Sequence, residues 1–343
     1  NLEDEQWLYI HGISRGHPLV LELINRGASA TAFHETLENY VTVEIFSKLS
    51  AEQKRVLSVL SIFREPVSID ALSNQKLNID VLDSLVEQGL ARQVDSEVYD
   101  VHDLIREFLL RSLDEQHKIE LHNKCSSWYQ LTTDVPVFTI ELIFHLVSSK
   151  NMVDAASIIV EKGRSLISQG HLELLSLIDS LEQSELTGNF STKINHYKGE
   201  ILALLGRFEE AKAAFVLAQK TASKSKDVNT QAELLSALAD ISLKQGNLDE
   251  SLNMHLEALG IFIKLKDAIG AARSYNNMGY ILRRKNDKSK ALESYGEVEA
   301  ILKENDDDEL IGSQLILARA LMELGEIERA RDHALEAFDK TDK

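Results

Sequence analysis

The feature that most constrains the fold of this chain is an internal repeat in its C-terminal half. Each copy begins with a glycine or asparagine, continues through a polar turn and ends five residues later at a small residue. The four copies are Gly206–Ala211, Gly246–Ser251, Asn286–Ala291 and Gly325–Ala330. Their first residues, which we call the repeat anchors, are separated by 40, 40 and 39 positions. Because self-similarity at a fixed period is typical of stacked structural units, this half is predicted to form a repeat array.

Small residues accompany every anchor at fixed distances. Seven positions before the anchors stand Gly199, Ala239, Gly279 and Ala318. Twelve positions after them stand Ala218, Ala258, Val298 and Ala337. Small side chains at helical offsets let two antiparallel helices approach closely, and glycine or asparagine suits the left-handed conformation that ends many helices. The pattern therefore predicts four helix pairs, with each anchor at the end of a first helix.

This frame is similar to the tetratricopeptide repeat, a helix-turn-helix unit with a usual period of about 34 residues. The longer period here implies longer helices or loops. Weaker copies begin at Asn151 and Gly170. Because each repeat contacts only its neighbours, the resemblance implies a curved stack whose first helices line a concave groove.

The first helix of the third repeat carries candidate partner-binding residues. Arg273, Asn276, Tyr280 and Arg283 follow the spacing of neighbours on a helix surface, so we expect them to share one face. In peptide-binding tetratricopeptide proteins, an asparagine and basic residues in this region hold a peptide backbone or carboxylate, and the resemblance implies such a role here. A solvated polar face would give the same pattern.

Residues 45–113 are predicted to form a winged helix. The expected elements are a helix after the capping box Ser50–Gln53, a short helix from Ser68, a third helix between Asn78 and Gly89, a hairpin around Asp95-Ser96, and a helix from Asp103. A helix that binds DNA needs basic or amide side chains directed at bases and phosphates. The third helix instead offers Asp80, Asp83 and Glu87, so we do not expect direct DNA binding.

Composition supports a helical protein without a broad nucleic-acid interface. Three prolines and 16 glycines in 343 residues provide few turns for an all-β fold. The 55 acids against 37 bases leave a net charge of −18, which repels a phosphate backbone. A single cysteine, Cys125, fits a reducing cytoplasm, and no apolar run approaches the roughly 20 residues of a membrane span. We expect a mostly α fold, with a winged-helix domain followed by an α-solenoid of tetratricopeptide-like helix pairs, and a cytoplasmic location.

Three further segments resemble the signal-transduction ATPases with numerous domains (STAND), of the NB-ARC and MalT-like type. Val101-His102-Asp103-Leu104 resembles the Met-His-Asp motif of their winged helix, with valine in place of methionine. Gly16–Leu21 resembles the Gly-x-Pro-Leu segment of their small helical subdomain, and Leu121–Leu146 resembles the helical linker of MalT-like regulators. The order of subdomain, winged helix and repeat sensor is also that of the family.

The family implies nucleotide-binding roles for two residues. His102 would contact the β-phosphate of ADP in the closed state, and Pro18 would pack against the adenine. An imidazole N–H at a helix N-terminus is plausible chemistry for binding an anion. Locally, His102 and Asp103 could equally cap a helix, and Pro18 could start one.

The sequence has no Gly-x-x-x-x-Gly-Lys-Ser/Thr phosphate-binding loop. We therefore expect that this chain is not itself an enzyme and that no cofactor binds it in isolation. ADP and ATP would be bound in a longer parent protein, whose N-terminal nucleotide-binding domain would be a partner of this chain.

The resemblance divides the chain into four parts: 1–44, the end of the helical subdomain; 45–113, the winged helix; 114–190, a helical linker with degenerate repeats; and 191–343, the tetratricopeptide repeats. It implies a switch in which a peptide or protein inducer in the groove favours an open state, nucleotide exchange and homo-oligomerisation. A MalT-like transcriptional regulator and a tetratricopeptide scaffold without nucleotide switching are the alternatives. An enzyme is disfavoured, because no His-x-x-x-His, Cys-x-x-Cys or Gly-x-Ser-x-Gly arrangement is present.

Overall fold

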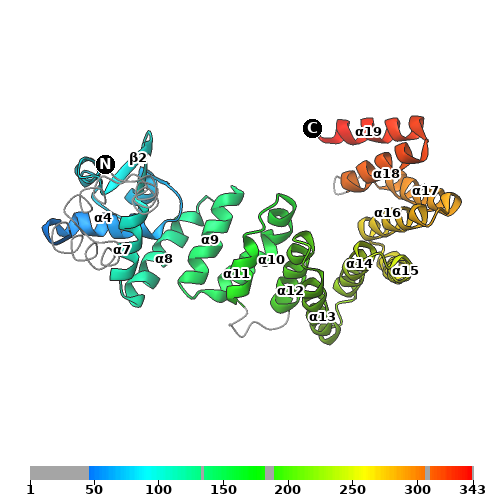
Figure 1. The fold of residues 1–343 in the computed structure, drawn as a ribbon, viewed down its shortest axis with the longest axis horizontal. Coiled ribbons are helices and arrows are strands. Elements are labelled where there is room, and N and C mark those ends of the chain that lie inside the picture. The colour runs from blue at the N-terminus through cyan, green and yellow to red at the C-terminus, as the bar shows by residue number, and fades with distance from the viewer. Residues whose placement is uncertain (1–45, 133–134, 182–188, 306–309, 342–343) are drawn as a thin grey trace, which may run out of the picture. The chain divides into compact units, whose positions relative to one another are not determined.

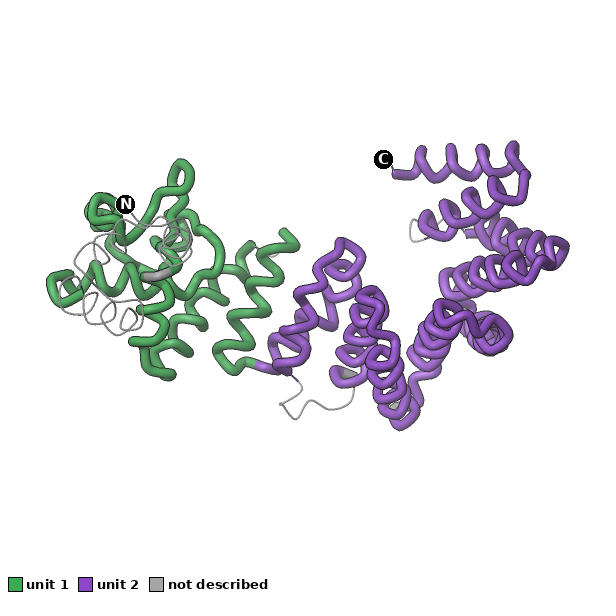
Figure 2. Tube along the Cα trace, viewed as in Figure 1, with its two compact units in different colours: residues 1–151 green, residues 152–343 purple. Residues whose placement is uncertain are grey.

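The computed structural model describes residues 46–132, 135–181, 189–305 and 310–341. These residues are mostly helical, and the chain divides into two compact units, 1–151 and 152–343 (Figure 2). The division falls within the stretch 114–190 that we expected to be a helical linker. The expected subdomain at 1–44, with Pro18, lies outside the described residues. Among the described helices, none combines the length and apolar character needed to cross a membrane.

The first unit contains a small sheet among short helices (Figure 1). Its elements up to Ser112 are η2 (Phe46–Lys48), α4 (Ala51–Ile62), β1 (Val67–Ser68), α5 (Ile69–Asn74), α6 (Val81–Glu87), β2 (Ala91–Asp95), β3 (Val98–Val101) and α7 (Asp103–Ser112). The three strands are antiparallel in the order β1-β3-β2. β1 adds an edge strand to the expected hairpin.

Local chemistry explains where these elements begin and end. The predicted capping box is confirmed: the Gln53 N–H donates to Ser50 Oγ at 3.1 Å, and the Ser50 N–H donates to Gln53 Oε1 at 2.9 Å. Gly89 follows α6 with a φ of 70°, and Glu97 forms the hairpin turn with a φ of 60°. The apolar side of α4, including Leu57, is fully buried. The turn and cap residues thus fix the ends, and apolar burial holds the helix in place.

The same unit ends in the helical hairpin of α8 (Glu115–Tyr129) and α9 (Pro136–Ser148). Two histidines meet inside it: the Nδ1 atoms of His122 and His145 lie 2.8 Å apart. The Tyr129 ring stacks on His145 at a centroid distance of 5.5 Å, and the Phe63 ring meets it edge-on at 5.7 Å. Burial lowers the pKa of His122 to about 4 and the pKa of His145 well below its ordinary value. Both rings are therefore neutral at pH 7 and share one hydrogen bond.

The second unit is a tetratricopeptide-like α-solenoid (Figure 1). It opens with α10 (Met152–Ser168) and α11 (Leu174–Leu181). The four predicted pairs follow as α12 (Asn189–Leu204) with α13 (Phe208–Ser225), α14 (Val228–Lys244) with α15 (Leu248–Leu265), α16 (Ala268–Arg284) with α17 (Lys288–Glu304), and α18 (Ile311–Leu324) with α19 (Ile327–Thr341). Long helices account for the long period: α14 has 17 residues and α15 has 18.

The anchors behave as the sequence predicted. Gly206, Gly246, Asn286 and Gly325 have φ values of 76°, 88°, 62° and 86°, which is the left-handed region. Each follows the end of a first helix and turns the chain into the second helix of its pair. The predicted function of the anchors as turn residues is confirmed.

The small residues before the anchors allow the predicted close approach. A Cβ atom added at Gly279 would lie 2.5 Å from Cε1 of Tyr295, and one added at Gly199 would overlap the Phe215 ring. Within the second repeat, Ser251 Oγ donates a hydrogen bond of 2.7 Å to the carbonyl oxygen of Ala239. The helices of a pair therefore meet where side chains are smallest.

Candidate functional site

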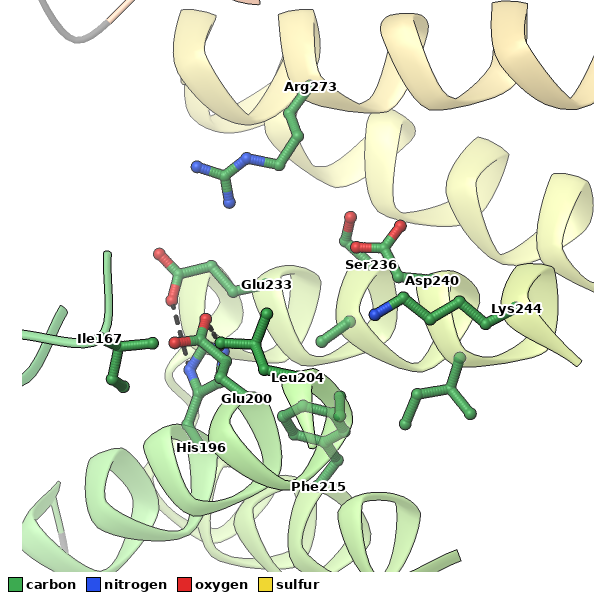
Figure 3. Close-up of a pocket in the computed structure, with 13 residues that line it drawn as sticks. Ile167, His196, Glu200, Leu204, Phe215, Glu233, Ser236, Asp240, Lys244 and Arg273 are labelled. Carbon is green, nitrogen blue, oxygen red and sulfur yellow. Dashed lines mark ion pairs between the residues drawn. The ribbon is translucent and has the colours of Figure 1, made fainter. Parts of the chain in front are cut away.

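Consecutive first helices of the solenoid, α12, α14, α16 and α18, contact one another. This places them together on the inner side of the curved stack, and we call their exposed face the groove. A pocket of about 230 Å³ opens in it between α12, α14 and α16 (Figure 3). Its apolar lining includes Ile167, Ala203, Leu204, Phe215, Ala237 and Ile241. Its polar lining is His196, Glu200, Glu233, Ser236, Asp240, Lys244 and Arg273.

Two carboxylates in the pocket surround a buried histidine. His196 is 2% exposed; its Nε2 lies 3.3 Å from Glu200 Oε1, and its Nδ1 lies 3.8 Å from Glu233 Oε2. Arg164 and Lys193 approach the same Glu233 oxygen at 3.5 and 3.7 Å. Two cations therefore stand beside Glu233, whereas the neighbour of Glu200 is the His196 ring.

Glu200 is ionised despite its location. Burial raises the pKa of its carboxyl group, but a hydrogen bond with His196 and the nearby charges of Arg164 and Arg273 outweigh burial. The pKa of Glu200 therefore lies below its ordinary value. The pocket holds fixed negative charge at neutral pH, with positive charge around it.

A second polar group lies at the other end of the pocket. The fully buried ring of His255 has Nδ1 3.4 Å from Ser236 Oγ and Nε2 3.2 Å from Asp240 Oδ1. Asn277 Nδ2 donates to the same Asp240 oxygen at 2.8 Å. A hydroxyl, an imidazole and a carboxylate also occur together in hydrolases, but there backbone N–H groups stabilise an oxyanion. Ser236 lies within α14, whose N–H groups bond along the helix. The arrangement fixes Asp240 and offers no oxyanion site.

Two cations also line the pocket. Arg273 and Lys244 are both exposed, and neither forms an ion pair with a described residue. Arg273 reaches toward the pocket from α16, across from Glu233 and Glu200 (Figure 3). Lys244 Nζ lies 5.8 Å from the centre of the Phe208 ring. The pocket therefore combines an apolar floor with two cations that are available to a ligand.

The four predicted partner-binding residues fall in different surroundings. Arg273 lines the pocket, and Tyr280 is 40% exposed. Arg283 forms an ion pair with Glu323 and lies 5.3 Å from the centre of the Tyr280 ring. Asn276 is only 1% exposed, and its Nδ2 donates to the Ser313 carbonyl oxygen at 3.0 Å. The exposed face expected for all four residues therefore does not include Asn276, which joins α16 to α18.

Sequence reasoning missed most of the acidic side of the pocket, although the repeat frame contained the signal. His196 stands ten positions before its anchor, as Asn276 does. Glu200 and Asp240 stand six positions before theirs, as Tyr280 does. Extending the predicted positions from the third repeat to the first two would have located these residues.

His102 lies in the first unit, between β3 and α7. Its carbonyl oxygen accepts the first helical hydrogen bond of α7, from the Arg106 N–H at 2.9 Å, and its side chain is half-buried. Beside it, the buried carboxylate of Asp100 forms ion pairs with Arg92 and Arg106. Within the described parts of the chain, no group of three or more His, Cys, Asp or Glu side chains could hold a metal ion.

Family models for the tetratricopeptide repeat match residues 230–304 and 312–336. The repeats are tetratricopeptide-like. A comparison with curated protein sequences gives no match.

Several solved structures are similar to the chain. A STAND protein with a tetratricopeptide repeat sensor from Pyrococcus horikoshii has 20% identity and a TM-score of 0.44, covering 98% of this chain and 57% of its own. This chain thus spans little more than half of that protein. Aspartyl phosphate phosphatase F from Bacillus subtilis has 12% identity and a TM-score of 0.47, covering 90% of this chain and 88% of its own. A kinesin light chain with tetratricopeptide-like repeats from Podosopora anserina has 16% identity and a TM-score of 0.39, covering 57% of this chain and 95% of its own.

Proposed function

We propose that the groove binds a peptide or protein partner. The observation that carries this proposal is the pocket between α12, α14 and α16, where Arg273 and Lys244 stand beside an apolar floor without carboxylate partners. A side chain with an apolar stem and a polar end fits such a surface better than a small uniformly polar solute. The groove also continues past the pocket onto α18, which suits an extended ligand.

The wider proposal is that this chain is the regulatory and inducer-sensing half of a STAND-type signalling ATPase. Its support is the sequence resemblance at Val101–Leu104, which spans the end of β3 and the start of α7. The order helix, strand, helix, helix, hairpin from α4 to β3 is typical of a winged helix. In this proposal the winged helix helps to hold ADP in the resting state, and a ligand in the groove shifts the protein toward an open state.

The proposal assigns ADP contacts to His102 and Pro18. A histidine immediately before α7 would add a donor where the helix dipole already favours a phosphate. The remaining nucleotide contacts would come from the nucleotide-binding domain of the parent protein, with homo-oligomerisation following ADP release.

Peptide display tests the groove. The chain, purified with and without the double substitution Arg273→Ala and Lys244→Ala, is panned against a random peptide library. We expect the wild type to enrich a family of peptides and the double variant to lose it. Lys264→Ala, at an exposed lysine on the second helix α15, is the matched control. Failure of the wild type to enrich any peptides would refute the proposal.

Nucleotide retention tests the switch. In the longer protein that the proposal requires, wild type should purify with bound ADP, and His102→Ala should release it faster. His117→Ala removes an exposed histidine of α8 and should leave release unchanged. A parent that holds no nucleotide would favour the alternative of a tetratricopeptide scaffold without switching. A DNA-binding domain in that parent, together with retained ADP, would favour the MalT-like regulator.

A further inference from the structure

The pocket defines which positions of each repeat face the groove. The lining residues that lie on first helices stand at fixed distances before the anchor of their repeat. These distances are thirteen, ten, nine, six, five, three and two positions. The same offsets in the third and fourth repeats identify groove positions beyond the pocket. Those used below are Tyr280, Arg283, Arg284, Leu315, Ile316, Arg319, Met322 and Glu323.

Four of these residues form an apolar patch on α16 and α18. Tyr280 is 40% exposed, Leu315 is 48% exposed, and Ile316 and Met322 are each 53% exposed. The two helices contact each other, and the four residues stand at groove positions of adjacent repeats. Apolar side chains gathered in this way, beside charged ones, are typical of a surface that a partner covers.

The acids of the groove already have partners within the chain. Glu233 lies beside Arg164 and Lys193, and Glu200 lies beside His196. Asp240 accepts a hydrogen bond from Asn277 and lies beside His255. The remaining acid, Glu323, forms ion pairs with Arg283 and Arg319. A basic ligand would have to compete with Arg164 and Lys193 for Glu233, and with Arg283 and Arg319 for Glu323.

Three cations of the groove lack a carboxylate within ion-pair distance among the described residues. Arg273, Lys244 and Arg284 are exposed, and none of them forms an ion pair with a described residue. Lys244 and Arg284 stand at equivalent positions, two before Gly246 and Asn286. The Arg284 guanidinium lies 6.0 Å from the centre of the Tyr280 ring, at the edge of the apolar patch. In a chain with a net charge of −18, these three side chains bring positive charge to the groove.

We infer that the groove recognises a peptide segment in which acidic residues alternate with apolar ones. This inference rests on the proposed binding function and specifies the chemistry of the partner. Acidic groups would pair with Arg273, Lys244 and Arg284, while apolar side chains would cover Tyr280, Leu315, Ile316 and Met322. Charge complementarity would select the partner and speed its association, and apolar burial would supply most of the affinity.

The sequences recovered by peptide display test the inference. Wild-type chain should select peptides rich in Asp or Glu next to large apolar residues. The double variant Arg273→Glu and Arg284→Glu should bind those peptides at least about tenfold more weakly and select basic residues instead. Lys264→Glu makes the same type of charge change on α15 and should leave the selection unchanged. Circular dichroism confirms that each variant remains helical.

The apolar patch is tested separately. Ile316→Ser together with Met322→Ser should weaken binding of the same peptides while retaining the preference for acids. Selection of basic or uncharged peptides by the wild type would overturn the inference and leave the proposed binding function standing. Recovery of no peptides would remove both. An unchanged acid preference after charge reversal would place the acidic contacts elsewhere and also overturn the inference.

Discussion

At the residue scale, a single buried ring determines the identity of Gly279. The Tyr295 side chain, 1% exposed, occupies the space where a Cβ atom would stand. We therefore expect Gly279→Ala to destabilise the protein by about 1–3 kcal/mol, because the ring or the helix must move. Urea unfolding followed by circular dichroism measures the change.

Gly260 is the matched control for this substitution. It also lies within a helix, α15, but a Cβ added there would meet no atom within 4 Å. Gly260→Ala should stabilise by about 0.5–1 kcal/mol, because alanine is the better helix former. Equal effects at the two glycines would show that helix propensity, rather than close packing of α16 on α17, governs both.

Residue-scale prediction from sequence succeeded where a local rule determines the outcome. The left-handed conformation of the anchors and the capping box at Ser50 depend only on neighbouring residues, and both are confirmed. Asn276 shows the limit. Its helical spacing matches that of Arg273 and Tyr280, but packing against α18 buries it, and only the neighbouring repeat determines that outcome.

At the element scale, the α8–α9 hairpin should lose stability in acid. The pKa of His122 is lowered to about 4 by burial, with Lys118 adding to the effect and Glu115 opposing it. The unfolded chain, with an ordinary histidine pKa of 6.5, therefore takes up a proton before the folded chain does. Stability should fall as the pH drops from 6.5 to about 4, by at most about 3 kcal/mol from this residue.

His122→Asn should make this acid-induced loss smaller, because an amide does not titrate and can replace the ring Nδ1 as a hydrogen-bond partner of His145. Urea midpoints measured across that pH range give the comparison. His117→Asn is the control: that exposed ring has its pKa raised by a hydrogen bond with Asp114, so its contribution has the opposite sign. An unaltered pH profile in His122→Asn would contradict the assignment of acid sensitivity to the pair.

The start of α14 provides a second test at this scale. Asp227 accepts hydrogen bonds from the Thr230 N–H at 3.0 Å and from Thr230 Oγ1 at 2.7 Å. Burial raises the pKa of Asp227, but these bonds outweigh it and hold the pKa below 3.8. The contribution is therefore complete above pH 3.8 and is lost as pH falls through the lowered pKa of the folded state.

Asp227→Ala should cost about 1 kcal/mol at neutral pH and less in strong acid. Asp227→Asn keeps a cap and should recover most of the loss at neutral pH. Thermal unfolding of the three proteins at two pH values distinguishes them. If Asn were no better than Ala, the cap would not be the source of the stability.

The helices were easier to predict than the sheet for a physical reason. The helix pairs repeat, so four copies of one pattern report the same structure. The edge strand β1 has two residues, Val67 and Ser68, and pairs with Tyr99 and Val98 thirty or more positions away. A segment of that length carries no alternation, and only the partner strand makes it a strand.

At the scale of the whole molecule, the arrangement of the second unit implies that damage should remain local. Each first helix contacts its own partner and the neighbouring repeats, so stability is approximately a sum over adjacent repeats. The pocket depends on this arrangement, since its polar residues come from three successive first helices and no single repeat contains them all. This is also why sequence analysis of one repeat found Arg273 but not His196 or Glu233.

Leu317 tests this localisation. It is fully buried in α18, and Leu317→Ala should remove about 2–5 kcal/mol from the packing around it. In hydrogen-exchange mass spectrometry, α16–α19 should lose protection, because Tyr295, Leu321 and Leu317 share one apolar cluster. The pair α12–α13, which contacts α14 but is separated from α18 by two intervening repeats, should keep its protection. Equal loss from α12 to α19 would mean that the solenoid unfolds as one cooperative body, and the groove would then form or dissolve as a whole.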